Sequence, residues 1–239
     1  MSALPLSLDD DQLAYYRSYF TDFFVGDFCP GMGTEHILDT LADSGASGDW
    51  LDLGAGPCTL FWSIALSDIR SIQSTDAAPE ALAVLREVAQ SGEVPRAFGQ
   101  VLDRHGKDTA HLDQMRARMS GYHVFDAMQS WPDTFTGQRF DLITEFGLFG
   151  LSPSVDGYRA CFRHVKEHLR AGGRVVGADW IRSAQYVASA GHDNTYLSED
   201  LIASAVSGAG LRLTSSRLCP IAGDELYDAL IVWSAEHTE

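Results

Sequence analysis

Residues 49–66 read DWLDLGAGPCTLFWSIAL, and this stretch decides the fold. Trp50 to Leu53 is a short apolar run that suits a buried parallel strand. Residues 54–57 (GAGP) interrupt the strand, and residues 59–66 are apolar enough to form a helix packed on a sheet. Because ligands bind beyond the carboxyl ends of parallel strands, this order of strand, glycine turn and helix predicts a ligand-binding edge of an α/β sheet.

The glycine turn and a later acid together predict a nucleoside ligand. Glycines let the backbone approach a ligand closely, although a short tight turn without a ligand would look similar. The dinucleotide fingerprint needs a third glycine, where this chain has Thr59, and Pro57 lacks an amide for a phosphate. Asp76 follows the next expected strand (71–75), about twenty residues after the turn, a spacing that suits a ribose diol. The alternative role of Asp76 is an ordinary helix cap.

The remaining pattern predicts a Rossmann-like α/β fold with a seven-stranded mixed sheet whose last strand is antiparallel. Further strands are expected at 122–125, 140–144 and 174–178, and an antiparallel pair at 211–218 and 226–234. We expect helices at 34–43, 79–90, 108–119, 154–170 and 198–208, with loops at 91–107 and 181–197. The antiparallel end favours S-adenosylmethionine over a nicotinamide cofactor, because dehydrogenase sheets usually end in a parallel strand.

We expect a single domain over residues 1–239, made of N-terminal lid helices (1–45) and a sheet core (46–239). Residues 11–28 are crowded with aromatic side chains at helical spacing. Such a stripe usually faces a core, but a tyrosine-bearing helix placed before the first strand would also suit a lid over a cleft. The stripe consists of Tyr16, Tyr19, Phe20, Phe23 and Phe24.

Composition narrows the partners to small molecules. The net charge of −16 argues against nucleic acid and anionic membranes, which both need a basic surface. The chain has no apolar run of about 18 residues, and its N-terminal stretch MSALPLSLDDDQ has no signal-peptide pattern. The four cysteines are scattered without metal-ligand spacing. We therefore expect a cytoplasmic protein with reduced thiols, no metal and a small-molecule substrate.

At this level of detail the chain resembles the small-molecule methyltransferases that include the nicotinamide, phenylethanolamine and thioether enzymes. The resemblance covers nearly the whole chain and implies an S-adenosylmethionine-dependent methyltransferase with a helical lid. It is carried by YYRSYF (15–20), LDLGAGP (51–57), TD (75–76), the expected helix before FDA (125–127), FGLFGLSP (146–153) and HLRAGG (168–173).

The resemblance also implies a set of residues that bind the cofactor. One group would hold the methionine portion: Tyr15 through its carboxylate, and Gly54 and Gly56 through close backbone approach, with Asp52 on the preceding strand. A second group would hold the adenosine portion: Asp76 at both ribose hydroxyls, Ala77 beside the adenine, Asp126 at its amino group and the Ala127 amide at a ring nitrogen.

The substrate side departs from the family pattern. Phe149 stands where the phenylethanolamine enzyme has an acid that holds an amine, and the second such acid falls near Arg182 and Ser183. A cationic-amine site of that type is therefore absent. Asn194 corresponds to a serine near the substrate amide of the nicotinamide enzyme, and Asp179 lies within one residue of an acid that this enzyme needs. Arg182 could hold an acceptor carboxylate bidentately, although it could also be a surface arginine.

We expect N-methylation by in-line transfer, with catalysis mainly by positioning. A general base is needed only if the acceptor atom must lose a proton first. The catalytic candidates are Asp179, Glu145 and Tyr186, and the substrate candidates are Phe149, Arg182, His192 and Asn194, with Tyr227 also facing the methyl group. Glu145 and His192 could instead be surface residues, and Tyr186 could merely pack.

Three other functions remain open from the sequence. The first is an O- or S-methyltransferase on the same scaffold. The second is an enzyme that cyclises S-adenosylmethionine and releases methylthioadenosine, which a cavity closed by Phe146 and Phe149 would suit. The third is a cofactor-binding protein without catalysis.

Overall fold

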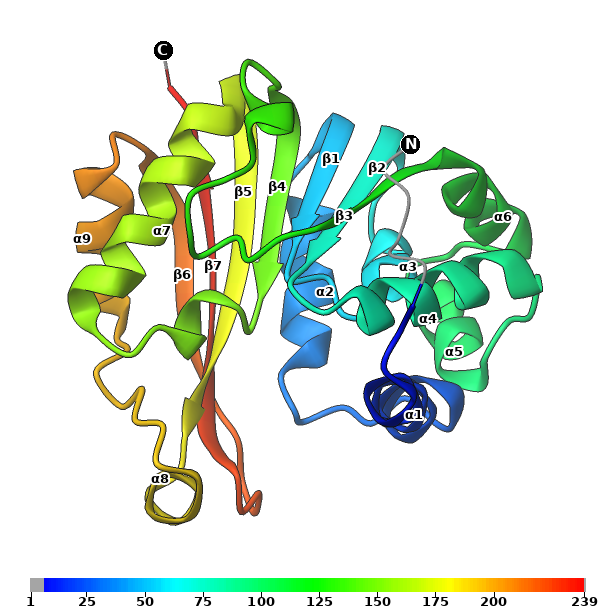
Figure 1. The fold of residues 1–239 in the computed structure, drawn as a ribbon, viewed down its shortest axis with the longest axis horizontal. Coiled ribbons are helices and arrows are strands. Elements are labelled where there is room, and N and C mark those ends of the chain that lie inside the picture. Colours follow the sequence, from blue (N-terminus) through cyan, green and yellow to red (C-terminus); the bar gives the residue numbers. More distant parts are fainter. Residues whose placement is uncertain (1–6, 239) are drawn as a thin grey trace.

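The computed structural model describes residues 7–238, and its centre is a seven-stranded sheet (Figure 1). Residues 1–6, which belong to the predicted lid segment and to MSALPLSLDDDQ, lie outside the described residues, as does Glu239. The strand order is β3-β2-β1-β4-β5-β7-β6, and β7 runs antiparallel to β5 and β6. The predicted fold class is confirmed. The strands are β1 (Ser47–Leu53), β2 (Asp68–Asp76), β3 (Met119–Val124), β4 (Phe140–Phe146), β5 (Leu169–Arg182), β6 (Arg212–Pro220) and β7 (Tyr227–Glu236).

The strand order reverses between β1 and β4, which creates the crevice in which α/β sheets bind ligands. Leu53 pairs with Thr75 on one side and with Glu145 on the other, so the carboxyl ends of β1, β2 and β4 lie level. Residues that follow these three strands therefore meet at one edge. Trp50, Leu51 and Leu53 are fully buried, as expected for a strand covered on both faces.

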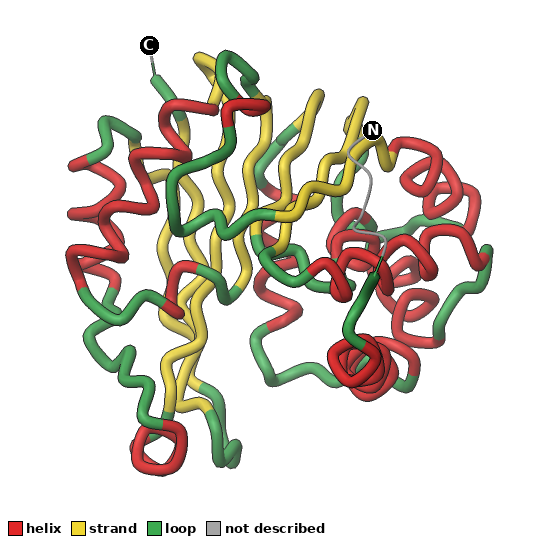
Figure 2. The backbone as a smooth tube through the Cα atoms, viewed as in Figure 1, coloured by secondary structure: helices red, strands yellow, loops and turns green. Residues whose placement is uncertain are grey.

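Helices cover both faces of the sheet, as Figure 2 shows. In one core cluster, helices α2 through α6 pack against the sheet. In the other, helices α7 and α9 pack against it. The helices are α2 (Thr34–Asp43), α3 (Thr59–Ser63), α4 (Pro79–Ser91), α5 (Arg96–Arg104), α6 (Thr109–Arg118), α7 (Val155–His168), α8 (Ala184–Ala190) and α9 (Glu199–Gly208), with 3₁₀ turns at Asp133–Phe135 and Phe149–Leu151.

Two predicted loops contain helices. Within 91–107, α5 buries Ala97, Phe98, Val101 and Leu102, and the helical spacing of these residues is a signal that could have predicted the helix. Within 181–197, α8 buries no residue, so it carries no hydrophobic period that could reveal it. Its only start signal is Ser183, whose hydroxyl accepts a hydrogen bond from the Tyr186 amide.

Helix α1 (Asp10–Phe20) is capped at its N-terminus by Asp9, and it continues into a π-helical turn at Thr21–Val25. Phe20 and Phe24 are buried and stack on each other with ring centroids 5.8 Å apart. The aromatic stripe is thus divided, because Phe20 and Phe24 join the core while the tyrosines face the cleft described below.

Two polar contacts hold α1 against α4. The Asp9 amide donates to Glu80 Oε1 at 2.8 Å, and Arg17 forms an ion pair with Glu87 at 2.7 Å. Since α4 begins just after Asp76, these contacts place α1 beside the carboxyl end of β2.

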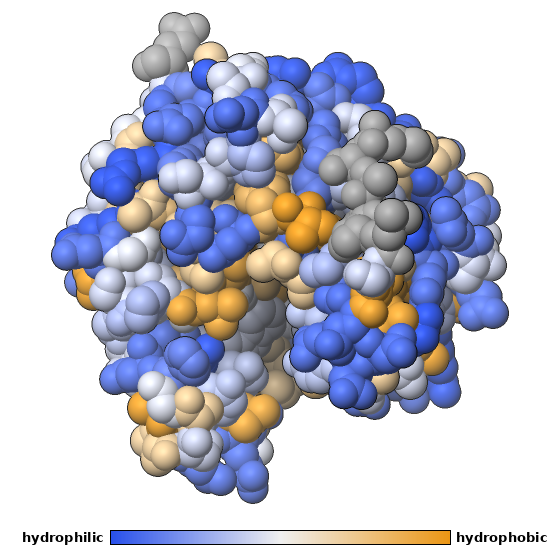
Figure 3. Space-filling model, in the orientation of Figure 1, coloured by the Kyte–Doolittle hydropathy of each residue, from blue (hydrophilic) through white to orange (hydrophobic). Residues whose placement is uncertain are grey.

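Strands β5 and β7 run past the level of the other strand ends and carry α8 at their tip (Figure 1). Arg182, the last residue of β5, pairs with Tyr227, the first residue of β7. Together with α1 this tip flanks a hollow that the space-filling view shows (Figure 3). Within residues 7–238, no helix has the length and apolar character needed to cross a membrane.

Candidate functional site

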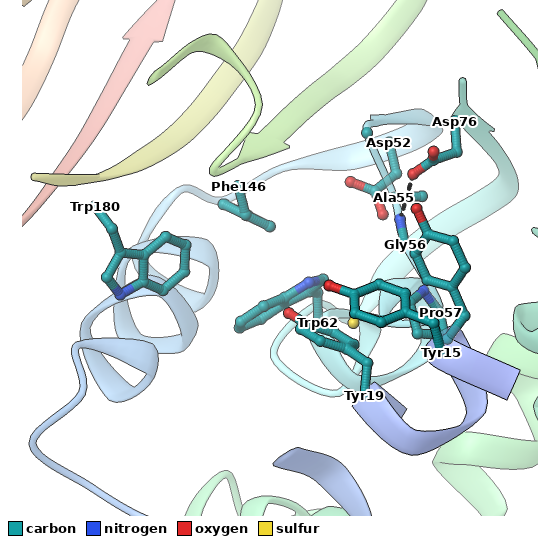
Figure 4. Close-up of a pocket in the computed structure, with 13 residues that line it drawn as sticks. Tyr15, Tyr19, Asp52, Ala55, Gly56, Pro57, Trp62, Asp76, Phe146 and Trp180 are labelled. Atoms are coloured by element: carbon teal, nitrogen blue, oxygen red, sulfur yellow. Dashed lines mark hydrogen bonds between the residues drawn. The ribbon is translucent and has the colours of Figure 1, made fainter. Parts of the chain in front are cut away.

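Three adjoining pockets lie at the carboxyl ends of the strands, and Phe146 lines all of them. The central pocket, of about 200 Å³, lies between the glycine loop after β1 and helix α1 (Figure 4). The Asp126 pocket, of about 330 Å³, lies beyond the ends of β2 and β3. The Arg182 pocket, of about 180 Å³, lies toward the tip of β5 and β7.

The glycine loop and Asp76 form one hydrogen-bonded unit. Gly54 and Gly56 have φ angles of +60° and +50°, a region that favours glycine. A Cβ on Gly54 would also lie 3.0 Å from the Leu148 side chain. The Gly56 amide donates to Asp76 Oδ2 at 2.9 Å, and the Ala78 amide donates to Oδ1 at 2.9 Å. The carboxylate of Asp76 is therefore fixed where it lines both the central and the Asp126 pockets.

Asp52 forms the floor of the central pocket and is held by threonines. Its Oδ2 accepts a hydrogen bond from Thr59 Oγ1 and its Oδ1 accepts one from Thr144 Oγ1, each at 2.6 Å. Trp50 Nε1 donates in turn to Thr144 Oγ1 at 2.8 Å. Burial raises the pKa of Asp52 to about 7, although the two threonine hydrogen bonds act in the opposite direction.

Three tyrosines of α1 line the cleft: Tyr15, which was predicted to bind the cofactor, and Tyr16 and Tyr19, which were predicted only as part of the aromatic stripe. Figure 4 shows Tyr15 and Tyr19 extending from α1 into the cleft, where their rings lie beside Trp62. Tyr16 lines the central and Asp126 pockets, and burial followed by the charge of Asp76 raises its pKa to about 12. Tyr19 lines the central and Arg182 pockets, and burial raises its pKa. The i, i+4 spacing of Tyr15 and Tyr19 is the signal that could have added Tyr19 to the predicted site.

The Asp126 pocket brings together the residues predicted for the adenosine portion. The Phe125 amide donates to the Asp76 carbonyl at 3.0 Å, which joins the ends of β2 and β3. Asp126 Oδ1 accepts a hydrogen bond from the Met128 amide at 2.9 Å. Ala77 and Ala127 line the same pocket.

The Arg182 pocket is walled mainly by aromatic side chains. Arg182 is 8% exposed, and its Nη1 donates to the His192 carbonyl at 2.9 Å. Its guanidinium carbon lies 5.1 Å from the centroid of the Tyr186 ring. The residues that line the pocket are Tyr19, Phe146, Gly147, Gly150, Leu151, Trp180, Arg182, Asn194 and Tyr227.

Three predicted residues of the 181–197 segment hold Arg182 in place. Asn194 uses its oxygen to accept from the Arg182 amide and its Nδ2 to donate to the carbonyls of Gly150 and Trp180. It therefore has no side-chain donor left for a substrate. His192 is exposed and contributes its carbonyl, and Tyr186 packs against the guanidinium, but neither lines the pocket.

Glu145 and Asp179 do not face the cleft, which corrects their assignment as catalytic candidates. Both are fully buried, and none of the three pockets is lined by them. Asp179 accepts hydrogen bonds from the Gly150 amide at 2.5 Å and from the Tyr158 hydroxyl at 3.0 Å, and Glu145 Oε2 accepts one from the Phe149 amide at 3.1 Å. Burial raises the pKa of both carboxyl groups.

The reason lies in the alternation of side chains along a strand. Phe146 and Trp180, one residue later on β4 and β5, point into the cleft, so the acids point to the other face. The two predicted acids each come directly before one of these aromatic residues in the sequence. Phe149, which was expected to contact the substrate, is also fully buried. Its ring packs against that of Phe162, with the ring centroids 5.4 Å apart.

The site fits S-adenosylmethionine. The two oxygens of Asp76 can accept hydrogen bonds from a ribose diol, and Asp126 can accept one from an adenine amino group. The glycine loop leaves room for close backbone approach, since a side chain at Gly54 would collide with Leu148. Within residues 7–238, no group of three His, Cys, Asp or Glu side chains is arranged to hold a metal ion.

Comparisons with known proteins agree with this fit. A family model described as the NNMT/PNMT/TEMT family matches residues 12–228. A search of curated proteins finds no match. Among solved structures, the N-methyltransferase NodS from Bradyrhizobium japonicum WM9, in complex with S-adenosylhomocysteine, is 15% identical with a TM-score of 0.61 and covers 96% of this chain and 98% of its own.

Two further structures carry the same product. Magnesium protoporphyrin IX methyltransferase (ChlM) from Synechocystis PCC 6803 is 13% identical, with a TM-score of 0.58 over 96% of this chain and 95% of its own. The DhpI complex with S-adenosylhomocysteine is 18% identical, with a TM-score of 0.56 over 96% of each chain. At these identities the likeness is one of fold.

Proposed function

We propose that this chain, which belongs to the NNMT/PNMT/TEMT family of S-adenosylmethionine-dependent methyltransferases, methylates a small molecule at an unprotonated nitrogen. When bound, S-adenosylmethionine supplies an electrophilic methyl group on a sulfonium. The protein must then hold an acceptor atom in line with that methyl group and exclude water.

The cofactor would lie across the central and Asp126 pockets. Asp76 would accept from the ribose hydroxyls, and Asp126 and the Ala127 amide would meet the adenine. The glycine loop, with Tyr15 opposite it, would enclose the methionine portion. Asp52 would lie beneath this portion in a fixed position, since each of its oxygens accepts a hydrogen bond from a threonine hydroxyl.

The observation that carries the nitrogen proposal is the chemistry of the Arg182 pocket. Its described lining contains no carboxylate, imidazole or amine that could accept a proton. Burial raises the pKa of Tyr19 and of Tyr227, so both remain protonated near neutral pH. An alcohol or phenol would need a base to become nucleophilic, whereas a nitrogen lone pair does not.

Positioning is what the pocket can contribute to the rate. Tyr19, Phe146 and Trp180 line both the central and the Arg182 pockets, so they would form the walls along which acceptor and methyl group meet. Trp180 is itself anchored, because its Nε1 donates to the Met32 carbonyl at 3.1 Å. Such fixed aromatic faces would orient a planar acceptor without proton transfer.

A thioether sulfur is the second candidate acceptor, because it also needs no base. The cyclisation alternative is less well supported, since the Arg182 pocket of about 180 Å³ adjoins the cofactor pocket and offers space for a second substrate. Incubation with methyl-labelled S-adenosylmethionine and a panel of pyridines, amines, thioethers and phenols tests the proposal. We expect S-adenosylhomocysteine and a methylated nitrogen by mass spectrometry. Methylation of phenols alone, or methylthioadenosine as the nucleoside product, would overturn it.

A further inference from the structure

We infer that Arg182 binds an acidic group on the methyl acceptor, which makes the acceptor a single-ring nitrogen compound that carries a carboxylate. That the bound molecule is the acceptor rests on the proposed function, but the anion site itself does not. The inference follows from the burial of Arg182, the way its guanidinium is held, and the size of the pocket.

Arg182 is a buried positive charge without a negative partner. It is 8% exposed, and the ion pairs among residues 7–238 include none with Arg182. In that part of the chain its guanidinium hydrogen-bonds only to the His192 carbonyl, through Nη1. Since burial of an unpaired charge is costly, the arrangement suits an anion that arrives with the ligand.

The free edge of the guanidinium is held in a fixed position. The Arg182 backbone amide donates a hydrogen bond to the Asn194 side-chain oxygen, and the ring of Tyr186 lies under the guanidinium. Tyr186 stacks in turn on Tyr227, with ring centroids 6.0 Å apart. Nε and Nη2 keep their donors, and these two groups match the two oxygens of a carboxylate. Little side-chain entropy would be lost on binding, because the guanidinium is already oriented.

The dimensions of the pocket favour one ring. Its volume of about 180 Å³ is close to the roughly 150 Å³ of an engineered cavity that admits a single benzene molecule. Its aromatic walls suit a flat ligand. The net charge of −16 would repel an anion at long range, but salt screens that field beyond about 10 Å. At contact distance Arg182 is the only charged side chain in the described lining, so an ammonium group there would meet a like charge.

The test compares two ligands of nearly the same size and shape, one an anion and one neutral, and neither has a ring nitrogen that could accept a methyl group. Benzoate and benzamide are titrated by calorimetry into the protein saturated with S-adenosylhomocysteine. We expect benzoate to bind more tightly than benzamide. Arg182→Gln should weaken benzoate by about tenfold to a hundredfold and leave benzamide nearly unchanged. Arg182→Lys should recover only part of the lost benzoate affinity, because an ammonium group cannot present two parallel N–H donors to a carboxylate as a guanidinium does.

Two controls separate a local effect from misfolding. Arg163→Gln removes an exposed arginine of α7 and should leave both affinities unchanged. The affinity for S-adenosylhomocysteine should be the same in every variant. Equal affinities of the two ligands in the wild type, or an equal loss of both in Arg182→Gln, would overturn the inference.

The outcomes also distinguish this inference from the proposed function. If benzoate binds through Arg182 but no nitrogen compound, acidic or uncharged, is methylated, the anion site stands and the proposed function fails. If uncharged pyridines or amines are methylated while the affinity for benzoate is the same in the wild type and in Arg182→Gln, the proposed function stands and the anion site is refuted.

Discussion

The backbone amide of Arg182 donates a hydrogen bond of 2.9 Å to the side-chain oxygen of Asn194. Asn194 also donates to the carbonyls of Gly150 and Trp180, so one buried side chain joins the end of β5 to the turn after β4 and to the loop after α8. Asn194 therefore positions Arg182 through a direct hydrogen bond. Its own side-chain donors are both used within the protein, so it has none left to donate to a ligand.

Replacement of Asn194 should loosen the Arg182 pocket without affecting the cofactor. Asn194→Ala leaves two carbonyls and one amide without their partner, so we expect a loss of about 2–4 kcal/mol in the free energy of unfolding by urea titration. Benzoate affinity should fall, and S-adenosylhomocysteine affinity should not. Gln185→Ala on the exposed face of α8 serves as the control. Unchanged benzoate affinity in a destabilised Asn194→Ala protein would show that Asn194 does not position Arg182.

Removal of the Asp76 carboxylate should weaken cofactor binding strongly. Asp76→Ala eliminates the acceptors proposed for two ribose hydroxyls and releases the Gly56 amide from the loop. Each hydrogen bond to a charged group contributes about 1.5–3 kcal/mol, so we expect the affinity for S-adenosylhomocysteine to fall by about a hundredfold or more in calorimetry. Asp103→Asn, an exposed acid of α5, should bind as the wild type does. An unchanged affinity in Asp76→Ala would refute the placement of the ribose.

The buried carboxyl of Asp52 should make stability decrease with pH. Its pKa is about 7 in the folded protein and 3.8 at the ordinary value, so between these values the folded state holds a proton that the unfolded state has lost. Stability is then fully present below the unfolded pKa and is lost as pH rises toward 7. We expect Asp52 to contribute a loss of about 2–3 kcal/mol between pH 5 and pH 8.

Urea unfolding at several pH values measures this effect. Asp52→Asn removes the titrating group, so its free energy of unfolding should decline less steeply over the same interval. Glu145 and Asp179, whose pKa values burial also raises, contribute in the same direction and remain in the variant. Asp103→Asn should keep the full wild-type slope. A slope in Asp52→Asn equal to that of the wild type would contradict the assignment.

Asp179 should prove to be a structural acid and not a base. Asp179→Asn retains an oxygen that can accept from the Gly150 amide, so the turn below the Arg182 pocket should persist. Loss of a general base would lower kcat by about 10²–10⁴-fold, and we expect a change of less than about tenfold. The profile of kcat between pH 6 and pH 9 should keep its shape. Tyr158→Phe, which removes the other hydrogen bond to Asp179, should behave alike.

The cofactor side of the site could be predicted because it is encoded locally. Gly54, Gly56, Asp76 and Asp126 each lie at the end of a strand or within three residues after it, and level strand ends bring them together. The acceptor side could not, because it depends on which face a strand residue takes at its last position. A shift of one residue exchanges Glu145 for Phe146 and Asp179 for Trp180, and sequence alone does not fix where the strand ends.

The other features that sequence did not predict depend on contacts between residues far apart in the chain. Nothing near Asn194 in the chain reveals that it bonds to Gly150, and Arg182 could not be told from a surface arginine before its burial was known. Helix α8 escaped prediction because it packs no apolar face. The roles of residues 181–197 were therefore the hardest to predict from sequence, because this segment also contacts residues far away in the chain, such as Gly150 and Tyr227.

The π-helical turn at Thr21–Val25 makes the cleft depend on the length of the chain as well as its composition. A π turn holds one residue more than an α turn, so deletion of one residue there would restore an ordinary helix. With Phe24 still anchored against Phe61, α1 would rotate by about 100° about its axis. Tyr15 and Tyr19 would then leave the cleft although every side chain was still present. The angular phase of α1 is thus set by a single extra residue, and an insertion or deletion at this point would alter the site more than most substitutions.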